Sequence, residues 1–543
     1  MIAKQFFGKI TWQVVLAIAV MHILAFFARE TVVEFPFLII VGVLTFATTW
    51  KSLHSGLLIV FTEIFVGGHG HLLDVSLSGF SLSIRMVIFL AVMLAWGITV
   101  LRPAMVGLKG SMRIKFELYR DLPWIVLSVA VSVGFLIGYL NNGFTSSFDD
   151  MNGYVTIAYL LPLISVNWDN DKRRQMLEML AGCLLWISAF TIILAFLFTH
   201  LDGDALHVLY TFVRDSRLAE ITLQVVDNKG GLLDIILTKF NLMQSNDYWY
   251  RIFMPAQFIL IPGITLLTSA SLFLWRGSRK TGWVWIAFVL LVTALLLSLS
   301  RSFILGLAVA AVSIFLVACF FGKKKLVTIP KRTIGLLIAG LVSMLLIWCV
   351  IMIPVPARPD LSDAAFFQTS AQTGRSEAVA SRWNLLESLM NGIYAHPILG
   401  SGFGTQVSYT SEDPRIITEF GEYMYSTYRL EWGWHDIWLK MGLLGLLAFV
   451  LYFASIMLVG WHTIKNHSFK WLAVGLLSGI IALFVAHTFS PYVNHPIGLG
   501  YMLFVIPFLD FGVRNKKFEL TLKKPELMKN HGKQQSVAVT MQK

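Results

Sequence analysis

Five arginines stand out in a polar stretch, Ala357 to Leu439, that lies between two long hydrophobic runs. They are Arg358, Arg375, Arg382, Arg415 and Arg429, and the stretch contains no lysine. A guanidinium group is planar, keeps its charge and can bind two oxygens of one anion, which an ammonium cannot do. Chance could produce such a bias. It is nevertheless typical of a site that binds a phosphate-like anion, and Arg375 and Arg429 are candidate substrate-binding residues.

Arg301 lies in Ser298-Leu299-Ser300-Arg301-Ser302, inside a nearly continuous apolar run from 282 to 321. A charge within such a run is costly and is a functional candidate by default. The alternative is an arginine at the end of a span whose head reaches the membrane interface. The flanking serines favour the functional interpretation.

Arg382 and Trp383 begin an apolar pattern that predicts an amphipathic helix ending near His396-Pro397. The apolar positions recur at helical spacing and are Trp383, Leu386, Leu389 or Met390, and Ile393. Such a helix could lie on the membrane surface with Arg382 near its start. Alternatively, Arg382 could pair with Glu377 or Glu387 on a solvated face. The pattern alone leaves both open.

His435 lies where the polar stretch ends, beside Asp436 and between Trp434 and Trp438. A neutral imidazole there could take a proton from a hydroxyl group at physiological pH, and Asp436 could orient the ring. The tryptophans, Trp434 among them, could bind a sugar ring or a lipid chain. The structural alternative is a packing histidine among interfacial tryptophans.

Gly400, Gly402 and Gly404 form a short glycine-rich run after a predicted helix end. The run does not follow a strand, so it fails the context required for dinucleotide binding. Gly402 and Gly404 could let backbone approach a substrate, or could form a plain turn. His69 and His71 have no accompanying carboxylate or cysteine cluster. We therefore expect no metal and no cofactor.

The composition defines the elements that must position these residues. Of the 543 residues, 56% are hydrophobic and 14% are charged, and the mean hydropathy is +0.71. Such a surface requires lipid, so the sequence predicts an all-α, polytopic bundle of about 12–14 spans. The runs 55–67 and 153–166 are short for a span, which needs about 20 residues.

The basic residues set the orientation and account for the net charge of +12. They gather in short loops between spans and in the tail, at 109–120, 172–174, 276–280, 323–332 and 516–524. By the positive-inside rule these loops and both termini are cytoplasmic. No nucleic-acid-binding module is visible, so we expect no nucleic-acid partner.

This orientation predicts the organisation of the chain. Residues 1–355 would form transmembrane helices with an outer loop at 200–251. Residues 356–436 would form a large periplasmic loop bearing the active site, followed by helices at 437–512 and a basic cytoplasmic tail at 513–543. Arg301 then lies at the outer end of its span, on the same face as both loops.

The order of these features resembles the bacterial O-antigen ligase and O-antigen polymerase superfamily. The resemblance rests on Ser300-Arg301, on Arg382-Trp383, on Ala395-His396-Pro397-Ile398-Leu399-Gly400-Ser401-Gly402-Phe403-Gly404, and on His435-Asp436-Ile437-Trp438-Leu439. It covers mainly residues 290–450. Asp436 stands where the family usually has asparagine.

The resemblance implies a GT-C-like fold and an inverting, metal-independent glycosyltransferase of the bacterial inner membrane. Its donor would be an undecaprenyl-diphosphate-linked glycan and its acceptor a glycan or a lipid. Arg301 and Arg382 would hold the diphosphate and His435 would act on the acceptor. Polymerisation of O-antigen, capsule or exopolysaccharide repeat units is favoured slightly over ligation to lipid A core or to protein.

Other classes of function stay open. A lipid-linked oligosaccharide flippase should carry its charges near the bilayer midplane and show two matching halves, which this sequence lacks. A purely structural subunit would not need Arg301 within an apolar run. A complex with a flippase or a chain-length regulator is a further expectation.

Overall fold

A computed structural model of the chain describes residues 6–77, 80–105, 117–225, 247–274, 282–321, 328–359, 374–411, 423–466 and 470–509. The basic tail predicted at 513–543 lies outside these residues.

Helices long and apolar enough to cross a membrane dominate the described chain, and there are nine of them. They are α2 (Lys9–Ala28), α3 (Glu34–Lys51), α6 (Leu118–Asn142), α9 (Asn170–His200), η2 (Pro255–Ile259) continued by α12 (Leu260–Leu274), α14 (Arg301–Phe321), α15 (Thr328–Ile351), α19 (Gly433–Asn466) and α20 (Lys470–His487). A helix pairs its own backbone groups, as lipid requires. The prediction of an all-α, polytopic membrane protein is confirmed.

Four shorter apolar helices accompany them. They are α4 (Leu53–Val66), α5 (Ile84–Met105), α13 (Gly282–Leu297) and α21 (Pro496–Val505), the last continued by η5 (Ile506–Phe508). The doubtful run 55–67 is α4. The other, 153–166, divides into the 3-10 helix η1 (Asn152–Tyr159) and the short α8 (Leu160–Ser165). The two sets of helices together fall within the expected range of spans.

The centre of the bundle is formed by α12 and α20. The apolar windows of Pro255–Phe273 and Lys470–His487 are each 78% buried, whereas those of α2, α3 and α15 are 22% buried. Helix α20 packs against α12, α14 and α19, and α19 packs along α6. Helices α14 and α19, which carry Arg301 and His435, therefore each have one face on the central helix α20, while α2, α3 and α15 present apolar surface for lipid.

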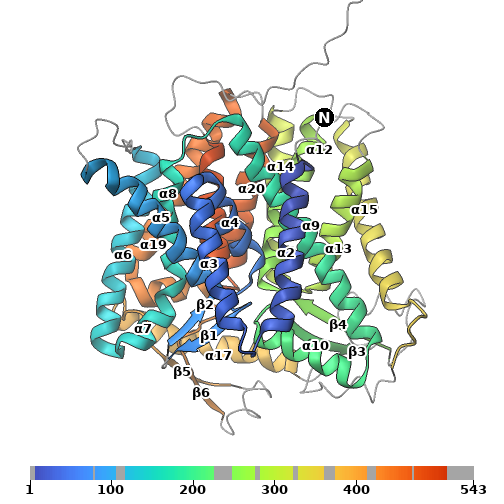
Figure 1. The fold of residues 1–543 in the computed structure, drawn as a ribbon, viewed down its shortest axis with the longest axis horizontal. Coiled ribbons are helices and arrows are strands. Elements are labelled where there is room, and N and C mark those ends of the chain that lie inside the picture. The colour runs from blue at the N-terminus through green and yellow to red at the C-terminus, as the bar shows by residue number, and fades with distance from the viewer. Residues whose placement is uncertain are drawn as a thin grey trace, which may run out of the picture.

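Polar elements gather at the end of the bundle opposite the N-terminus (Figure 1). They are α7 (Phe144–Met151), α10 (Gly203–Asp215), α17 (Gly374–Ala395) and three antiparallel hairpins, β1 (Asp74–Leu77) with β2 (Phe80–Ser83), β3 (Glu220–Val225) with β4 (Tyr248–Phe253), and β5 (Val407–Thr410) with β6 (Met424–Thr427). The two loops predicted at 200–251 and 356–436 thus contribute to the same end. We call it the outer end.

A small apolar core holds α17 on the bundle. Its buried residues are Leu385, Leu389 and Ile393 of α17 with Val407, Leu430 and Leu439. The predicted helix is present but begins earlier, at Gly374, and its buried stripe differs from the predicted one. Trp383 is 60% exposed because it faces away from this core. The buried face of α17 therefore contacts protein, β5 and α19, rather than a membrane surface.

The arrangement gives a topological prediction. Reporters fused near Glu412 and Asn228 should both be active in the periplasm, and one after Lys324 in the cytoplasm, because basic loops stay inside. Paired alkaline-phosphatase and fluorescent-protein fusions measure this directly. A cytoplasmic signal at Glu412 would contradict a periplasmic active site.

Candidate functional site

The glycine-rich run packs against α6 and α7. Gly402 has φ +88° and Gly404 φ +79°, so both adopt a conformation that favours glycine. A Cβ on Gly402 would collide with the backbone of Gly138 in α6, and both glycines are buried. The close backbone approach that the sequence predicts is thus an approach to α6. A direct contact of these glycines with substrate stays a prediction.

Phe403, between the two glycines, fixes the run in place. Its amide donates to Gly134 O at 3.1 Å. Its carbonyl accepts from Asn142 Nδ2 at 3.0 Å and from Ser147 Oγ at 3.1 Å. The run is thereby tied to α6 and α7.

Helix α19 is interrupted at Gly442, where φ is +61° and ψ is −160°. The break admits the 397–401 segment: Leu443 N donates to Pro397 O at 3.1 Å, and Ser401 N donates to Leu439 O at 2.6 Å. The part of α19 before Gly442 is therefore a short helix of its own. It carries His435, Asp436 and Lys440.

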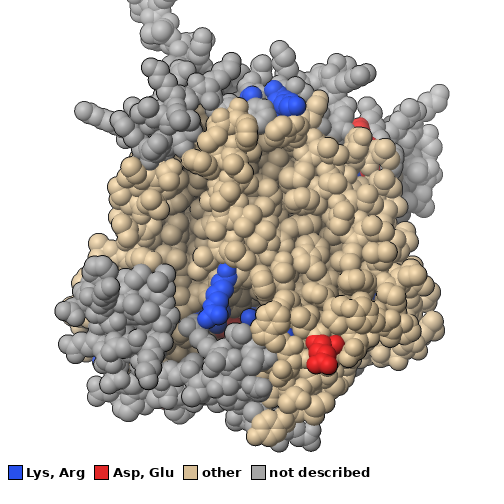
Figure 2. Space-filling view, turned by 180° about the vertical axis from the view of Figure 1, so that it is seen from behind, with Lys and Arg blue, Asp and Glu red and all other residues tan. Residues whose placement is uncertain are grey.

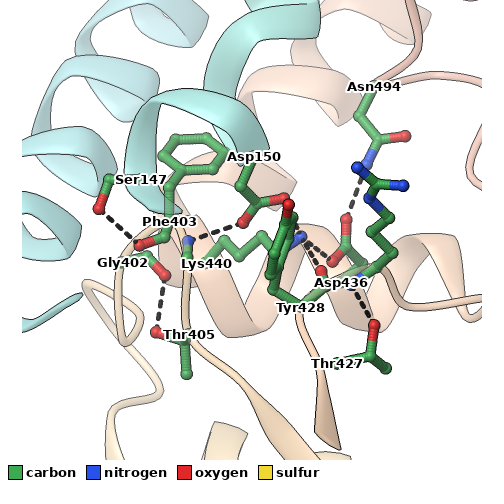
Figure 3. Close-up of polar contacts among 12 residues, drawn as sticks. Ser147, Asp150, Gly402, Phe403, Thr405, Thr427, Tyr428, Asp436, Lys440 and Asn494 are labelled. Atoms are coloured by element: carbon green, nitrogen blue, oxygen red, sulfur yellow. Dashed lines mark hydrogen bonds and ion pairs between the residues drawn. The ribbon is translucent and has the colours of Figure 1, made fainter. Parts of the chain in front are cut away.

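A buried charged cluster lies beneath this short helix (Figure 3). Lys440 Nζ lies 2.6 Å from Asp150 Oδ1 and 2.5 Å from Asp436 Oδ1. The three side chains are only 5%, 8% and 3% exposed. Buried charges require such pairing, because an unpaired one would cost several kcal/mol.

The cluster joins four separate segments. Asp436 Oδ2 accepts from Asn494 Nδ2 at 2.7 Å, and Asp150 Oδ2 accepts from the amide of Gly404 at 2.8 Å. Lys440 Nζ donates to the carbonyl of Tyr428 at 2.8 Å. The helix α7, the glycine-rich run, the segment before α19 and the segment before α21 are therefore held together at one point.

His435 is not oriented by Asp436, contrary to the prediction. Asp436 is engaged by Lys440 and Asn494, because successive helix residues point in different directions. The half-buried His435 ring instead lies against Trp432, with centroids 5.9 Å apart. Its Nδ1 is buried and has no hydrogen-bond partner in the described structure.

The loop 488–495, between α20 and α21, connects the candidate residues. At its start, Ser490 Oγ lies 3.1 Å from Ser302 Oγ, next to Arg301, and the Phe489 ring lies 5.9 Å from Trp432. At its end, Asn494 bonds Asp436, and the His495 ring lies 5.3 Å from His69.

Arg301 is the first residue of α14 and is exposed at the outer end. Its side chain has no hydrogen-bond or ion-pair partner among the residues that the structure describes. Leu299 adopts a left-handed conformation, with φ +46°, immediately before it. Figure 2 shows a hollow in the lower half of the molecule with lysine or arginine side chains at its wall.

Arg382 pairs with Glu431, and no pair with Glu387 is found among the described residues. The Glu377 side chain lies outside the described residues. Both side chains of the pair are about half exposed, at 47% and 49%, so the pair is screened by water and weak. Trp432 Nε1 donates to the Arg382 carbonyl at 2.9 Å, and the Trp383 ring lies 5.3 Å from Trp432. Trp432 therefore contacts α17, His435 and the 488–495 loop together.

The remaining predicted residues differ in their surroundings. Trp434 faces the bundle, where its ring lies 4.6 Å from His487 and 5.3 Å from Phe484, so it packs against protein. Arg429 is exposed, with its guanidinium 5.6 Å from the Tyr428 ring centroid. Arg375 is in the first turn of α17, but its side chain lies outside the described residues, as does Arg415.

Several site residues escaped the sequence analysis, above all Lys440, Asp150 and Asn494. Lys440 carried a usable signal, because it is a lysine inside a predicted span. Asp150 and Asn494 gave none, since each is an ordinary polar residue in a predicted loop. In the described chain, no group of three or more His, Cys, Asp or Glu could hold a metal ion.

The comparison with protein families decides the classification of this region. Residues 286–450 match the family model described as O-antigen ligase. This part of the chain is similar to that family, which supports its place in the O-antigen ligase and polymerase superfamily. No curated protein and no solved structure gives a match.

The O-antigen ligase match contains Arg301, Arg382, His435 and Lys440. It supports glycosyl transfer of the O-antigen ligase or polymerase type by a multi-pass membrane protein. Asp150 and the 488–495 loop lie outside the matched residues. The site is thus completed by segments on both sides of the O-antigen ligase region.

Proposed function

We propose that the protein is an inverting glycosyltransferase of the bacterial inner membrane that acts at its periplasmic face on undecaprenyl-diphosphate-linked glycan. Its favoured reaction is the polymerisation of polysaccharide repeat units. Transfer of a finished glycan to lipid A core, or to protein, is the second candidate. The single observation that carries the proposal is that Trp432 contacts the Arg382 carbonyl, His435 and Phe489 of the 488–495 loop, while Ser490 of that loop contacts Ser302, next to Arg301.

The chemistry follows from these three side chains. The acceptor hydroxyl oxygen bonds to the anomeric carbon as the bond from that carbon to the diphosphate oxygen breaks. His435 takes the hydroxyl proton, and the electron pair leaves on the diphosphate. Arg301 and Arg382 balance the negative charge that builds there, a role that suits fixed cations at the membrane face. A single displacement inverts the anomeric carbon.

The positions of the charged residues favour glycosyl transfer over transport of the lipid-linked glycan. A transporter of lipid-linked oligosaccharide would place its charges near the bilayer midplane. Here α17, which carries Arg382, belongs to the outer end (Figure 1), and the carbonyl of Ser298, three residues before Arg301, accepts from Arg251 of the outer-end strand β4 at 2.7 Å. The charged groups of the Asp150–Lys440–Asp436 cluster are buried and bound to one another, so they are not presented to a passing substrate.

Deletion of the gene tests the proposed reaction. A polymerase mutant should make lipid carrying a single repeat unit, seen as one short band on glycan gels. A ligase mutant should instead accumulate long glycan on undecaprenyl diphosphate. Unchanged glycan length and unchanged ligation would contradict both.

Arg382→Lys tests the bidentate role of the guanidinium. We expect product formation to fall roughly 10- to 100-fold, because a lost charge-assisted hydrogen bond is worth about 1.5–3 kcal/mol. Glycan made by membranes with matched protein amounts measures it. Arg214→Lys is the control, since Arg214 is an exposed arginine of the outer end that pairs with Asp215 and lies over the Tyr210 ring. Near-normal product from Arg382→Lys would make Arg382 a surface charge.

A further inference from the structure

The 67–70 turn, which no prediction included, brings basic groups together at the outer end. Arg85 Nε binds both carboxylate oxygens of Glu63, at 3.0 and 2.9 Å, and Arg85 Nη2 donates to Gly68 O at 2.9 Å. The other side of Gly68 lies against the backbone of Arg217. His69 contacts His495 at the end of the 488–495 loop.

Arg217 is held in an unusual conformation beside this turn. Its φ is +51°, which a residue other than glycine rarely adopts, and such strain is common at functional sites. Arg29 fixes the same turn by donating to Asp215 O at 2.7 Å. The Arg217 side chain is exposed and has no acidic partner in the described ranges.

Arg429 comes from a different segment, the one just before α19. Lys440 holds the carbonyl of the preceding Tyr428, so the buried cluster fixes the backbone from which Arg429 projects. Within the described chain Arg429 pairs with no carboxylate. Lys440, which binds the Tyr428 carbonyl, also pairs with Asp436, and Asp436 accepts from Asn494. Asn494 precedes His495, whose ring lies against His69.

The acidic groups around this place are already engaged. Glu63 binds Arg85, Asp215 binds Arg214 at 2.7 Å, and Asp74 accepts from His71 at 2.6 Å. The hydrogen bond from His71 lowers the pKa of Asp74. Arg217 and Arg429 are thus left as unbalanced positive charges.

The positive charges near the 67–70 turn also affect the pKa of His69. Its pKa is lowered to about 4, first by the protein that surrounds it and then by the positive charges of Arg85, Arg217, His71 and Arg429. At physiological pH the ring is therefore neutral and can act as a hydrogen-bond donor, while the two free arginines supply the charge.

We infer that Arg217, Arg429 and His69 form a second anion site, which binds the phosphate group of the acceptor lipid. The inference rests on the proposed function and deepens it. Arg301 lies by Ser490 at the start of the 488–495 loop, whereas His69 lies by His495 at its end. The two basic groups therefore flank the short helix that carries His435. One can hold the donor diphosphate while the other holds the acceptor.

The test compares two acceptors that share one glycan. Purified protein in detergent receives a glycan-labelled undecaprenyl-diphosphate donor and an acceptor repeat unit, either still on undecaprenyl diphosphate or released as free glycan. In Arg217→Ala and Arg429→Ala, we expect the KM for the lipid-linked acceptor to rise roughly tenfold or more relative to that for free glycan. Arg214→Ala should behave as the unmodified protein.

The other outcomes are distinguishable. Arg429→Lys keeps the charge, so its KM should rise less than that of Arg429→Ala. A rise in the donor KM instead would give the site to the donor diphosphate and overturn the inference. Equal losses with both acceptors would show a structural role and also overturn it.

Failure of the proposed function has a separate signature. If the unmodified protein transfers glycan to neither acceptor, the glycosyltransferase proposal fails. Binding of undecaprenyl monophosphate in micelles then tests the anion site alone. Tighter binding by unmodified protein than by the Arg217→Ala, Arg429→Ala double variant supports the site, and equal binding overturns it.

Discussion

Lys440→Met will lower the free energy of unfolding by about 3–5 kcal/mol, because it leaves two buried carboxylates without their counter-ion. Asp150 and Asp436 are 8% and 3% exposed, so water cannot replace the ammonium. The lost bond to Tyr428 O also frees the segment that carries Arg429. Chemical denaturation of the purified protein, or its apparent melting temperature in detergent, measures the change.

Two further variants make this expectation specific. The triple variant Asp150→Asn, Asp436→Asn, Lys440→Met removes all three charges and should recover most of the stability. Lys465→Met is the control on the same helix: Lys465 is exposed, with its ammonium 5.2 Å from the Trp461 ring, and its loss should cost less than about 1 kcal/mol. Equal effects of Lys440→Met and Lys465→Met would show that the cluster is not held by charge.

The same cluster explains why Asp436 is tolerated at a position where the resemblance leads one to expect asparagine. A buried aspartate needs a cation, and Lys440 provides it one helical turn later. Asp436 in place of asparagine and Lys440 one turn later therefore form one charge pair. Each of these two buried charges requires the other.

Spans and the outer helix were predictable because lipid imposes simple rules. Long apolar runs must form helices, and the composition leaves few alternatives. The spacing predicts the helix at Arg382, and Leu389 and Ile393 of its predicted stripe are buried, but the start of the stripe is wrong. Leu385 is buried and Trp383 is exposed, since α17 packs on β5 and α19 instead of on lipid. Periodicity reveals a helix without revealing what lies against it.

The candidate site was only partly predictable, for a physical reason. Arg301, Arg382 and His435 were conspicuous as single residues in costly or unusual places. The 488–495 loop was not, because its role lies in contacts with segments distant in sequence, such as Ser302 and Asp436. The proximity of Arg217 and His69 was not predictable either, because only the fold brings these two distant segments to one place.

The largest functional effect is expected at His435. His435→Gln keeps a polar side chain of similar size, but an amide cannot take the proton of the acceptor hydroxyl. We expect the rate of glycan transfer to fall roughly 100-fold or more. The ring lies against Trp432, which also contacts the Arg382 carbonyl and the 488–495 loop, and its buried Nδ1 has no protein partner in the described structure. No described protein group thus occupies the Nδ1 nitrogen of His435.

Binding and catalysis should separate in the His435→Gln variant. Undecaprenyl-diphosphate donor should still bind within about twofold, because Arg301 and Arg382, not His435, are expected to hold the diphosphate. His396→Gln is the matched control, as an exposed histidine of the same outer end, and should retain normal product. Robust product from His435→Gln would make the histidine a packing residue of Trp432. Loss of donor binding in that variant would instead place His435 in the diphosphate site, so turnover and donor affinity measured on one preparation assign its role.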